Sequence, residues 1–204
     1  MKNYQKKAFT LLEVLVSVFI ITLLTAVSLP RLREFQVRKQ LELTALEVKS
    51  AILETKNYAL APRNVTPGAG RKIRSYAIKI CGPSESSFCS PRNSYQILEC
   101  RTQEPPNYPE SCNSGGIYGL PYSEEVSVSP VQRLPQNISF SNINPWLNFG
   151  FLRFSVEEQG QLVGDFGFDG SSDSEVIIKL QQGTATYAIH LIKATGAAYV
   201  TKEQ

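Results

Sequence analysis

The first part of the chain is dominated by one long apolar run. The segment "FTLLEVLVSVFIITLLTAVSLP" (residues 9–30) has 22 residues, and Glu13 is its only charged one. As an α-helix it is roughly 33 Å long at ~1.5 Å per residue, enough to cross the hydrocarbon core of a membrane. A charged side chain in hydrocarbon costs about 2.5–3.5 kcal/mol on insertion scales. Glu13 therefore needs an explanation of its own.

Beyond Pro30 the pattern is that of an amphipathic helix. Apolar residues recur at steps of four, three and four, at Leu41, Ala45, Val48 and Ile52. Leu46 and Leu53 are predicted to widen this stripe. Pro30 lacks an N–H and is expected to kink or loosen the helix, whereas Pro62 ends it. The pattern predicts one helix from Phe9 to about Leu60, with a protruding first half and a second half packed on a head.

The rest of the chain alternates in short segments typical of strands. Residues 73–81 and 94–100 are predicted to form one antiparallel hairpin. The last third is predicted to be an antiparallel meander with turns at Gly160, Gly170, Gly183 and Gly196. Its strands are Asn137–Phe140, Phe151–Val156, Glu175–Gln181, Thr186–Lys193 and Ala197–Thr201. The predicted fold class is α+β, a long N-terminal helix packed on a C-terminal antiparallel β-sheet.

Length and charge restrict the possible functions. A chain of 204 residues, 42% of them hydrophobic, buries one core. Three of the 21 basic residues precede Phe9, which leaves 18 basic against 18 acidic residues in the remainder. A neutral body argues against a nucleic-acid partner, for which the only small basic cluster is Arg71, Lys72 and Arg74.

The four cysteines lie close together, within 32 residues, at Cys81, Cys89, Cys100 and Cys112. None has the C-x-x-C spacing of a zinc or redox site, and the only histidine, His190, is far away in sequence. The set indicates two disulfides and an oxidising compartment; the alternative is four free thiols in the cytosol. Of the three possible connectivities, sequential pairing, Cys81–Cys89 and Cys100–Cys112, is the prediction.

Other candidate chemistry is weak. Asp165, Asp169, Asp173 and Glu175 lie in a Gly/Ser-rich turn and make a weak calcium candidate, but the spacing is not that of an EF-hand. A polar turn is the preferred interpretation. His190 alternates with apolar neighbours in a predicted strand, and no nucleophile-elbow, zinc-protease or P-loop motif occurs. No enzyme, metal or cofactor is predicted.

Two ordinary interpretations of residues 1–30 compete. A secretory signal peptide fits the basic residues 1–7 and the small residues Ala26–Ser28, but the apolar run is long for one and contains a carboxylate. A plain transmembrane anchor also leaves Glu13 unexplained. Basic residues on both sides of the run do not orient it. The cysteines favour an external C-terminal part.

A third interpretation accounts for the whole string. "KKAFTLLEVLVSVFIITLLTAVSLP" (residues 6–30) resembles the leader and N-terminal segment of type IV pilins and type II secretion pseudopilins. In that family a basic leader ends in Gly, cleavage exposes an N-methylated Phe, a Glu follows four residues later, and a proline is common near the end of the run. The resemblance implies processing at Ala8 and Phe9 and a role in subunit assembly for Glu13 and Pro30. Ala8 replaces the usual Gly, and we expect processing to survive this change.

The same resemblance implies an organisation and a set of partners. It implies a leader at residues 1–8, a transmembrane and filament-core helix at 9–30, its amphipathic half at 31–61 and a β-rich head at 62–204. The carboxylate of Glu13 would lie beside the N-terminal ammonium group of a neighbouring subunit. Implied partners are other pilins or pseudopilins, the prepilin peptidase/N-methyltransferase, the inner-membrane assembly platform and the lipid bilayer. The implied location is the bacterial inner membrane, single-pass with a periplasmic or extracellular head, and then the pilus or pseudopilus.

The C-terminal part, residues 152–200, resembles more loosely the sheet of minor pseudopilin H of type II secretion and its pilus-assembly relatives. The two resemblances imply a pilin-like structural subunit, minor rather than major. Two alternatives stay open: a minor pilin that captures DNA, as some relatives of pseudopilin H do, and an anchored extracellular binding module.

Overall fold

The computed structural model describes residues 11–61, 71–84, 89–103, 123–156 and 158–203. The chain forms two compact units, residues 1–40 and 41–204. In the described part, the first unit consists of the N-terminal portion of the helix α1. The second unit holds the rest of α1 and all the strands.

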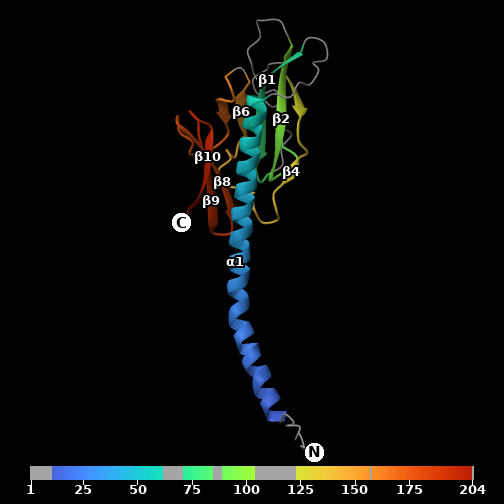
Figure 1. The fold of residues 1–204 in the computed structure, drawn as a ribbon, viewed down its shortest axis with the longest axis vertical. Helices are drawn as coiled ribbons and strands as arrows, with labels where there is room; N and C mark the ends of the chain where they lie inside the picture. Colours follow the sequence, from blue (N-terminus) through green and yellow to red (C-terminus); the bar gives the residue numbers. More distant parts are fainter. Residues whose placement is uncertain (1–10, 62–70, 85–88, 104–122, 157, 204) are drawn as a thin grey trace, which may run out of the picture. The chain divides into compact units, whose positions relative to one another are not determined.

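The helix α1 (Leu11–Leu60) is 50 residues long and continues through Pro30 (Figure 1). Its predicted C-terminal end at Leu60 is confirmed, and the Ala61 N–H closes the last turn on the Asn57 carbonyl at 2.9 Å. The sequence reason is Pro62, because the residue before a proline is pushed out of the helical conformation. The predicted start at Phe9 lies outside the described residues.

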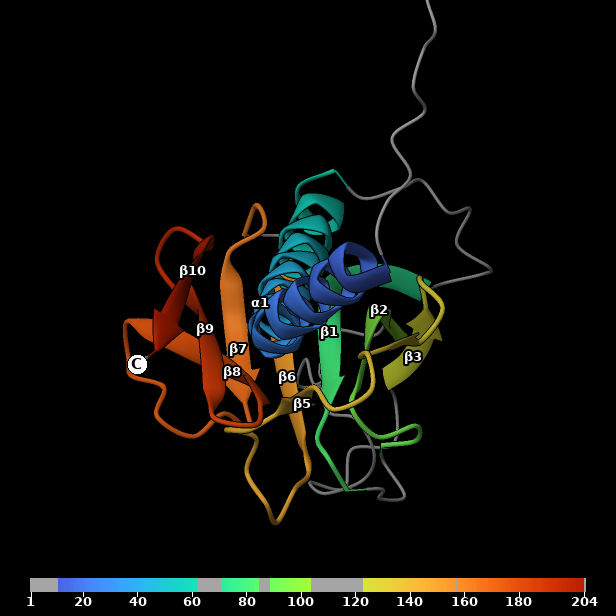
Figure 2. The same ribbon diagram turned by 90° about the horizontal axis from the view of Figure 1, so that it is seen from below.

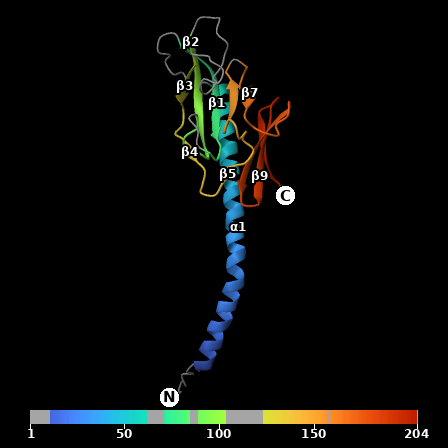
Figure 3. The same ribbon diagram turned by 180° about the vertical axis from the view of Figure 1, so that it is seen from behind.

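The first sheet is built around the predicted hairpin. β1 (Arg71–Cys81) and β2 (Ser94–Gln103) pair antiparallel, with Ile78 opposite Ile97. β6 (Phe149–Ser155) pairs with the other edge of β1, and β7 (Leu162–Phe166) pairs with β6. β3 (Ser123–Ser127) and β4 (Gln132–Arg133) both pair with β2. The strand order is β3-β2-β1-β6-β7. Figure 3 shows β1, β2, β3 and β7 from behind.

The second sheet has the order β10-β9-β8-β5 (Figure 2). Its strands are β5 (Ser139–Phe140), β8 (Glu175–Gln182), β9 (Ala185–Ile192) and β10 (Ala197–Glu203). The predicted run of hairpins from β8 to β10 is confirmed. Gly183 and Gly196 turn it with φ of +60° and +62°, a region that glycine enters without steric cost.

The prediction of one continuous meander in the last third is wrong. β6 pairs with β1, far back in the chain, and not with β8, so the strands divide between two sheets. Most of β6 is buried, residue after residue, as expected of a central strand covered on both faces. Alternation in the sequence indicates that a strand exists, but the choice of its partner is a long-range contact.

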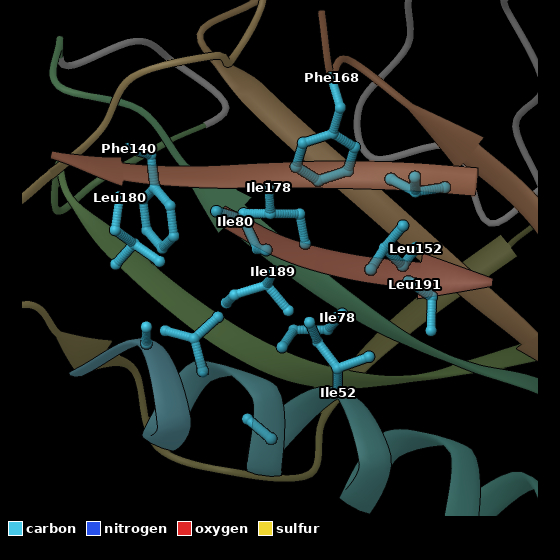
Figure 4. Packing of buried hydrophobic residues seen from close by; sticks show 14 of the residues in the cluster. Ile52, Ile78, Ile80, Phe140, Leu152, Phe168, Ile178, Leu180, Ile189 and Leu191 are labelled. Carbon is cyan, nitrogen blue, oxygen red and sulfur yellow. The ribbon is translucent and has the colours of Figure 1, made fainter. Parts of the chain in front are cut away.

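The main core lies between the second half of α1 and the two sheets. It contains apolar side chains of α1 together with those of β1, β6, β8 and β9 (Figure 4). The labelled members are Ile52, Ile78, Ile80, Phe140, Leu152, Phe168, Ile178, Leu180, Ile189 and Leu191. All four residues of the predicted helix stripe, Leu41, Ala45, Val48 and Ile52, are fully buried.

The prediction that Leu46 widens this stripe is wrong, and Leu53 is only partly buried. Small residues complete the buried face instead, at Thr44, Ala51, Thr55 and Ala59. Small side chains let the helix backbone approach the sheets closely. The buried Thr55 hydroxyl donates to the Ala51 carbonyl at 2.7 Å and so is not left unsatisfied.

Aromatic residues complete the contact between α1 and the first sheet. The rings of Tyr58 on α1 and Tyr76 on β1 lie 5.6 Å apart, and the Tyr58 hydroxyl donates to Glu54 at 2.7 Å. Burial raises the pKa of Tyr95, and the negative charges of Glu47 and Glu54 raise it further. The other face of the first sheet carries a smaller buried cluster of Ala77, Leu98, Cys100 and Phe151.

Candidate assembly site on the N-terminal helix

The candidate site is the first part of α1. Ala8 and Phe9 lie outside the described residues. Glu13 lies in the first turn of α1, and its side chain is exposed. Pro30 is within the helix, and its side chain lies outside the description.

Over residues 11–26, the part of this segment whose side chains the structure describes, every large apolar side chain is exposed. Their exposed fractions run from 47% at Val16 to 85% at Leu11. They are Leu11, Leu12, Val14, Leu15, Val16, Val18, Phe19, Ile20, Ile21, Leu23 and Leu24. Residues at successive positions point in different directions around a helix, so the apolar surface surrounds this one. A helix that is apolar all round requires an apolar environment or a protein partner on every side.

The hydroxyl groups of the segment are satisfied within the helix. Ser17 Oγ donates to the Glu13 carbonyl at 2.7 Å, and Thr25 Oγ1 donates to the Ile21 carbonyl at 2.8 Å. Thr22 Oγ1 lies within bonding distance of the Val18 and Phe19 carbonyls, at 3.0 and 2.8 Å. Because these O–H groups already have acceptors on their own backbone, their transfer into an apolar environment costs little.

The Glu13 carboxylate differs from these hydroxyl groups, because an ionised carboxylate only accepts hydrogen bonds. Its position in the first turn places it near the positive end of the helix dipole. That interaction contributes about 0.3–1 kcal/mol, well below the roughly 2.5–3.5 kcal/mol that a charge costs in hydrocarbon. The interaction with the helix dipole alone therefore does not offset the cost of placing the Glu13 charge in an apolar environment.

Searched over the described residues alone, the structure has no helix that is both long and apolar enough to span a membrane.

The weak calcium candidates do not form one site. Asp165 Oδ1 lies 2.9 Å from Lys193 Nζ, and Glu175 Oε1 lies 3.1 Å from His190 Nδ1. Asp169 and Asp173 complete the candidate set. Among the described residues, no three acidic, histidine or cysteine side chains are placed to hold a metal ion together. Two of the four carboxylates thus have cationic or imidazole partners.

The second sheet carries a polar cluster that the sequence did not reveal. His190 Nδ1 on β9 donates to Glu175 on β8 at 3.1 Å, and His190 Nε2 lies 2.8 Å from Thr201 Oγ1 on β10, within hydrogen-bonding distance. The Tyr199 ring stacks on the imidazole with centroids 4.7 Å apart, and its hydroxyl donates to Glu175 at 3.0 Å. This hydrogen bond raises the pKa of Tyr199. The hydrogen bonds of this cluster link the strands β8, β9 and β10.

One predicted disulfide lies within the described residues. Cys81 at the end of β1 is bonded to Cys89, with Cα atoms 5.4 Å apart. Cys100 is also disulfide-bonded, and no described cysteine is free. Cys112 lies outside the described residues, so the pairing Cys100–Cys112 stays a prediction. The side chains of the basic cluster at residues 71–74 also lie outside the description.

Comparison with known proteins identifies the N-terminal segment. The family model "Prokaryotic N-terminal methylation motif" matches residues 3–29. The match covers Lys6 and Lys7, the Ala8–Phe9 junction and the apolar run with Glu13 as far as residue 29. No curated protein and no solved structure shows a significant match to the chain.

Proposed function

We propose that this chain, which carries the N-terminal signal of type IV pilins and pseudopilins, is a minor pilin-like subunit. It assembles through α1 into a type IV pilus or a type II secretion pseudopilus. The observation that carries the proposal is the methylation motif at residues 3–29, which overlaps residues 11–26 of α1, where apolar side chains are exposed on all sides. The subunit acts by assembly, not by catalysis.

The proposed life cycle has two apolar environments. The subunit is first held in the bacterial inner membrane by residues 9–30, with its head outside the cytoplasm. The prepilin peptidase/N-methyltransferase removes residues 1–8 and methylates Phe9. The assembly platform then transfers the helix from lipid to the filament core, where helices of other pilins replace the lipid. Both environments match the apolar side chains and the internally satisfied hydroxyl groups of this segment.

In this proposal Glu13 favours transfer of the helix from lipid to the filament. Cleavage creates a free ammonium group on Phe9, and in the proposed filament the Glu13 carboxylate lies beside this group of a neighbouring subunit. A buried carboxylate is tolerated when a cation and hydrogen bonds compensate it. Glu13 is thus costly in lipid, and the ammonium group of the neighbouring subunit compensates this cost in the assembly.

Neither alternative function has a specific observation in its favour. Capture of DNA requires a basic surface, and the side chains of Arg71, Lys72 and Arg74 lie outside the description. An anchored binding module requires no carboxylate in its anchor, so a test of Glu13 separates it from a pilin.

The deciding experiment changes Glu13 in the full chain, in membranes that contain the partner pilins. Glu13→Ala and Glu13→Gln should leave cleavage intact and give the same mature N-terminus, N-methylated Phe9, by mass spectrometry. Crosslinking to partner pilins should fall strongly, because both variants lack the charge that the neighbour's ammonium group pairs with. Ser17→Ala is the matched control, since it removes only the hydroxyl bond to the Glu13 carbonyl.

Two results would contradict the proposal. A mature N-terminus at Leu29 would establish an ordinary signal peptide. Glu13→Ala protein that is cleaved and crosslinks at wild-type levels would show a plain anchor. Ala8→Gly should be cleaved at least as fast as wild type, because it restores the family's residue.

A further inference from the structure

The loop that joins β5 to β6 carries the only tryptophan of the chain, Trp146, at its surface. Its side chain is 93% exposed. Among the described residues outside α1, the other exposed large apolar side chains are Val131, Ile192 and Tyr199, which are between 37% and 44% exposed. An indole ring in water adds nothing to the core, so folding does not explain Trp146.

Buried asparagines hold this loop in place. Asn142 Oδ1 accepts a hydrogen bond from the Lys179 N–H of β8 at 2.7 Å. At the other end of the loop, Asn148 Nδ2 donates to the Ser84 carbonyl. Because both ends are bonded to other segments, the loop presents Trp146 in a fixed position. Binding at this ring therefore avoids much of the entropic cost of ordering a loop.

The loop is anchored on the side of the first sheet that α1 does not cover. Ile80 belongs to the main core under α1. Side chains alternate along a strand, so Cys81 lies on the opposite face. Leu147 packs there against Cys81 and Phe149. A ligand of Trp146 therefore does not compete with the contacts of α1.

An amide group lies next to the indole ring in the chain. The Trp146 N–H of the backbone donates to Asn144 Oδ1 at 3.0 Å, which fixes this amide. Among the described residues, none accepts a hydrogen bond from Asn144 Nδ2. Its two N–H groups are available to a ligand as donors.

The chemistry of the loop favours a neutral ligand. Residues 141–148, "SNINPWLN", contain no charged side chain. Asp169 and Lys179 contact the loop through their backbone atoms, and Lys179 Nζ is paired with Glu203 at 2.7 Å. Nucleic acids and anionic lipids are bound through Lys and Arg side chains and do not fit this loop. A protein interface buries about 800 Å² per partner around an apolar centre, and one ring supplies little of it.

We propose that Trp146 and the Asn144 amide bind one ring of a neutral oligosaccharide. A sugar such as glucose or N-acetylglucosamine has C–H groups on its ring faces, and these pack on the electron-rich face of an indole. The hydroxyl and acetyl oxygens at the sugar's edge accept hydrogen bonds from the Asn144 N–H groups. The inference goes beyond the proposed function, because it gives the head a ligand of its own.

The fluorescence of the only tryptophan tests this inference directly. The full chain, in a detergent without a sugar headgroup, is titrated with cellotetraose and, separately, with chitotetraose. At least one of these neutral sugars should shift the Trp146 emission to shorter wavelength and protect it from acrylamide quenching, because the ring leaves water.

Calorimetric titration of variants with the same sugar locates the site. Trp146→Ala should bind at least about tenfold more weakly, whereas Trp146→Phe keeps a ring and should bind better than the alanine variant. Asn144→Asp keeps the acceptor for the Trp146 N–H but loses the donors, so binding should weaken by about two- to tenfold. Val131→Gln is the control, since Val131 is exposed and lies outside the loop; it should bind like wild type.

Several results would overturn the inference. They are an emission that neither sugar changes, wild-type affinity in Trp146→Ala or Asn144→Asp, and protection of Trp146 by partner pilins but by neither sugar. A lowered melting temperature of Trp146→Ala would also overturn it, because the ring would then belong to the fold. None of these results involves Glu13 or processing at Phe9, so the proposed function is tested separately.

Discussion

At the scale of single residues, Gly150 shows how one absent side chain shapes the core. It lies in β6, and the ring of Phe168 occupies the position that a Cβ would take. Phe168 belongs to the main core and is seen at the edge of the cluster in Figure 4. The glycine therefore provides the space in which an aromatic side chain covers the strand.

Gly150→Ala should force the Phe168 ring out of its position. We expect the free energy of unfolding to fall by about 1–3 kcal/mol, as for other overpacked cores. Chemical denaturation of the detergent-solubilised protein measures it. Adding Phe168→Leu removes the collision, so the double variant should be more stable than the sum of the two single effects. Additive effects would show that the ring and the new methyl group do not meet.

At the scale of elements, α1 is one continuous helix with two different surroundings along its length. Residues 11–26 are exposed on all sides, while from Leu41 onward one face is fully buried. The buried face combines large side chains with alanine and threonine, which sets how closely the helix approaches the strands. The exposed face keeps Leu43 and Leu46.

A comparison of two alanine variants on α1 tests this division. Ile52→Ala should lower the free energy of unfolding by about 2–5 kcal/mol, because it leaves a cavity among β1, β8 and β9 side chains. Leu46→Ala should change it by no more than about 0.5 kcal/mol, as is usual for surface positions. Thermal and urea unfolding measure both. If both variants lost the same free energy of unfolding, Leu46 would have to be part of the buried stripe.

At the scale of the whole molecule, the second unit contains two sheets, and the disulfide Cys81–Cys89 joins the end of β1 to the segment before β2. The Cys81–Cys89 disulfide fixes the end of β1 beside Phe149, the first residue of β6. Next to it, the Gly82 N–H donates to the Asn148 carbonyl at 2.9 Å. The disulfide thus stabilises the end of the first sheet at which the β1–β2 hairpin meets β6, a strand from far along the chain.

Cys81→Ala/Cys89→Ala should lower the free energy of unfolding by about 2–3 kcal/mol, the loop-closure value for a short loop. The sequence separation that sets this value is 8. Unfolding of the variant beside wild type measures the loss. In the native protein, both thiols should resist alkylation until reduced; rapid labelling of unreduced protein from an oxidising compartment would contradict the bond.

The sequence by itself determined the features that depend on neighbouring positions. Helical periodicity and Pro62 predicted α1 and its end, and alternation predicted the β1–β2 hairpin. The basic leader followed by Phe9, Glu13 and the apolar run carried the resemblance to the methylation signal. The Cys81–Cys89 pairing followed in the same way, from two cysteines at the ends of a short loop. Each is a local property of the chain, so no knowledge of distant contacts was needed.

Only the tertiary structure decided which distant segments meet. It placed β6 beside β1, left Leu46 exposed while Thr44 and Ala51 were buried, and joined Glu175, His190 and Thr201 across three strands. Periodicity assigns a side chain to a face, but it does not say what covers that face. That depends on strand partners and on the shape of the surface opposite, both of which are set by contacts between residues far apart in the chain.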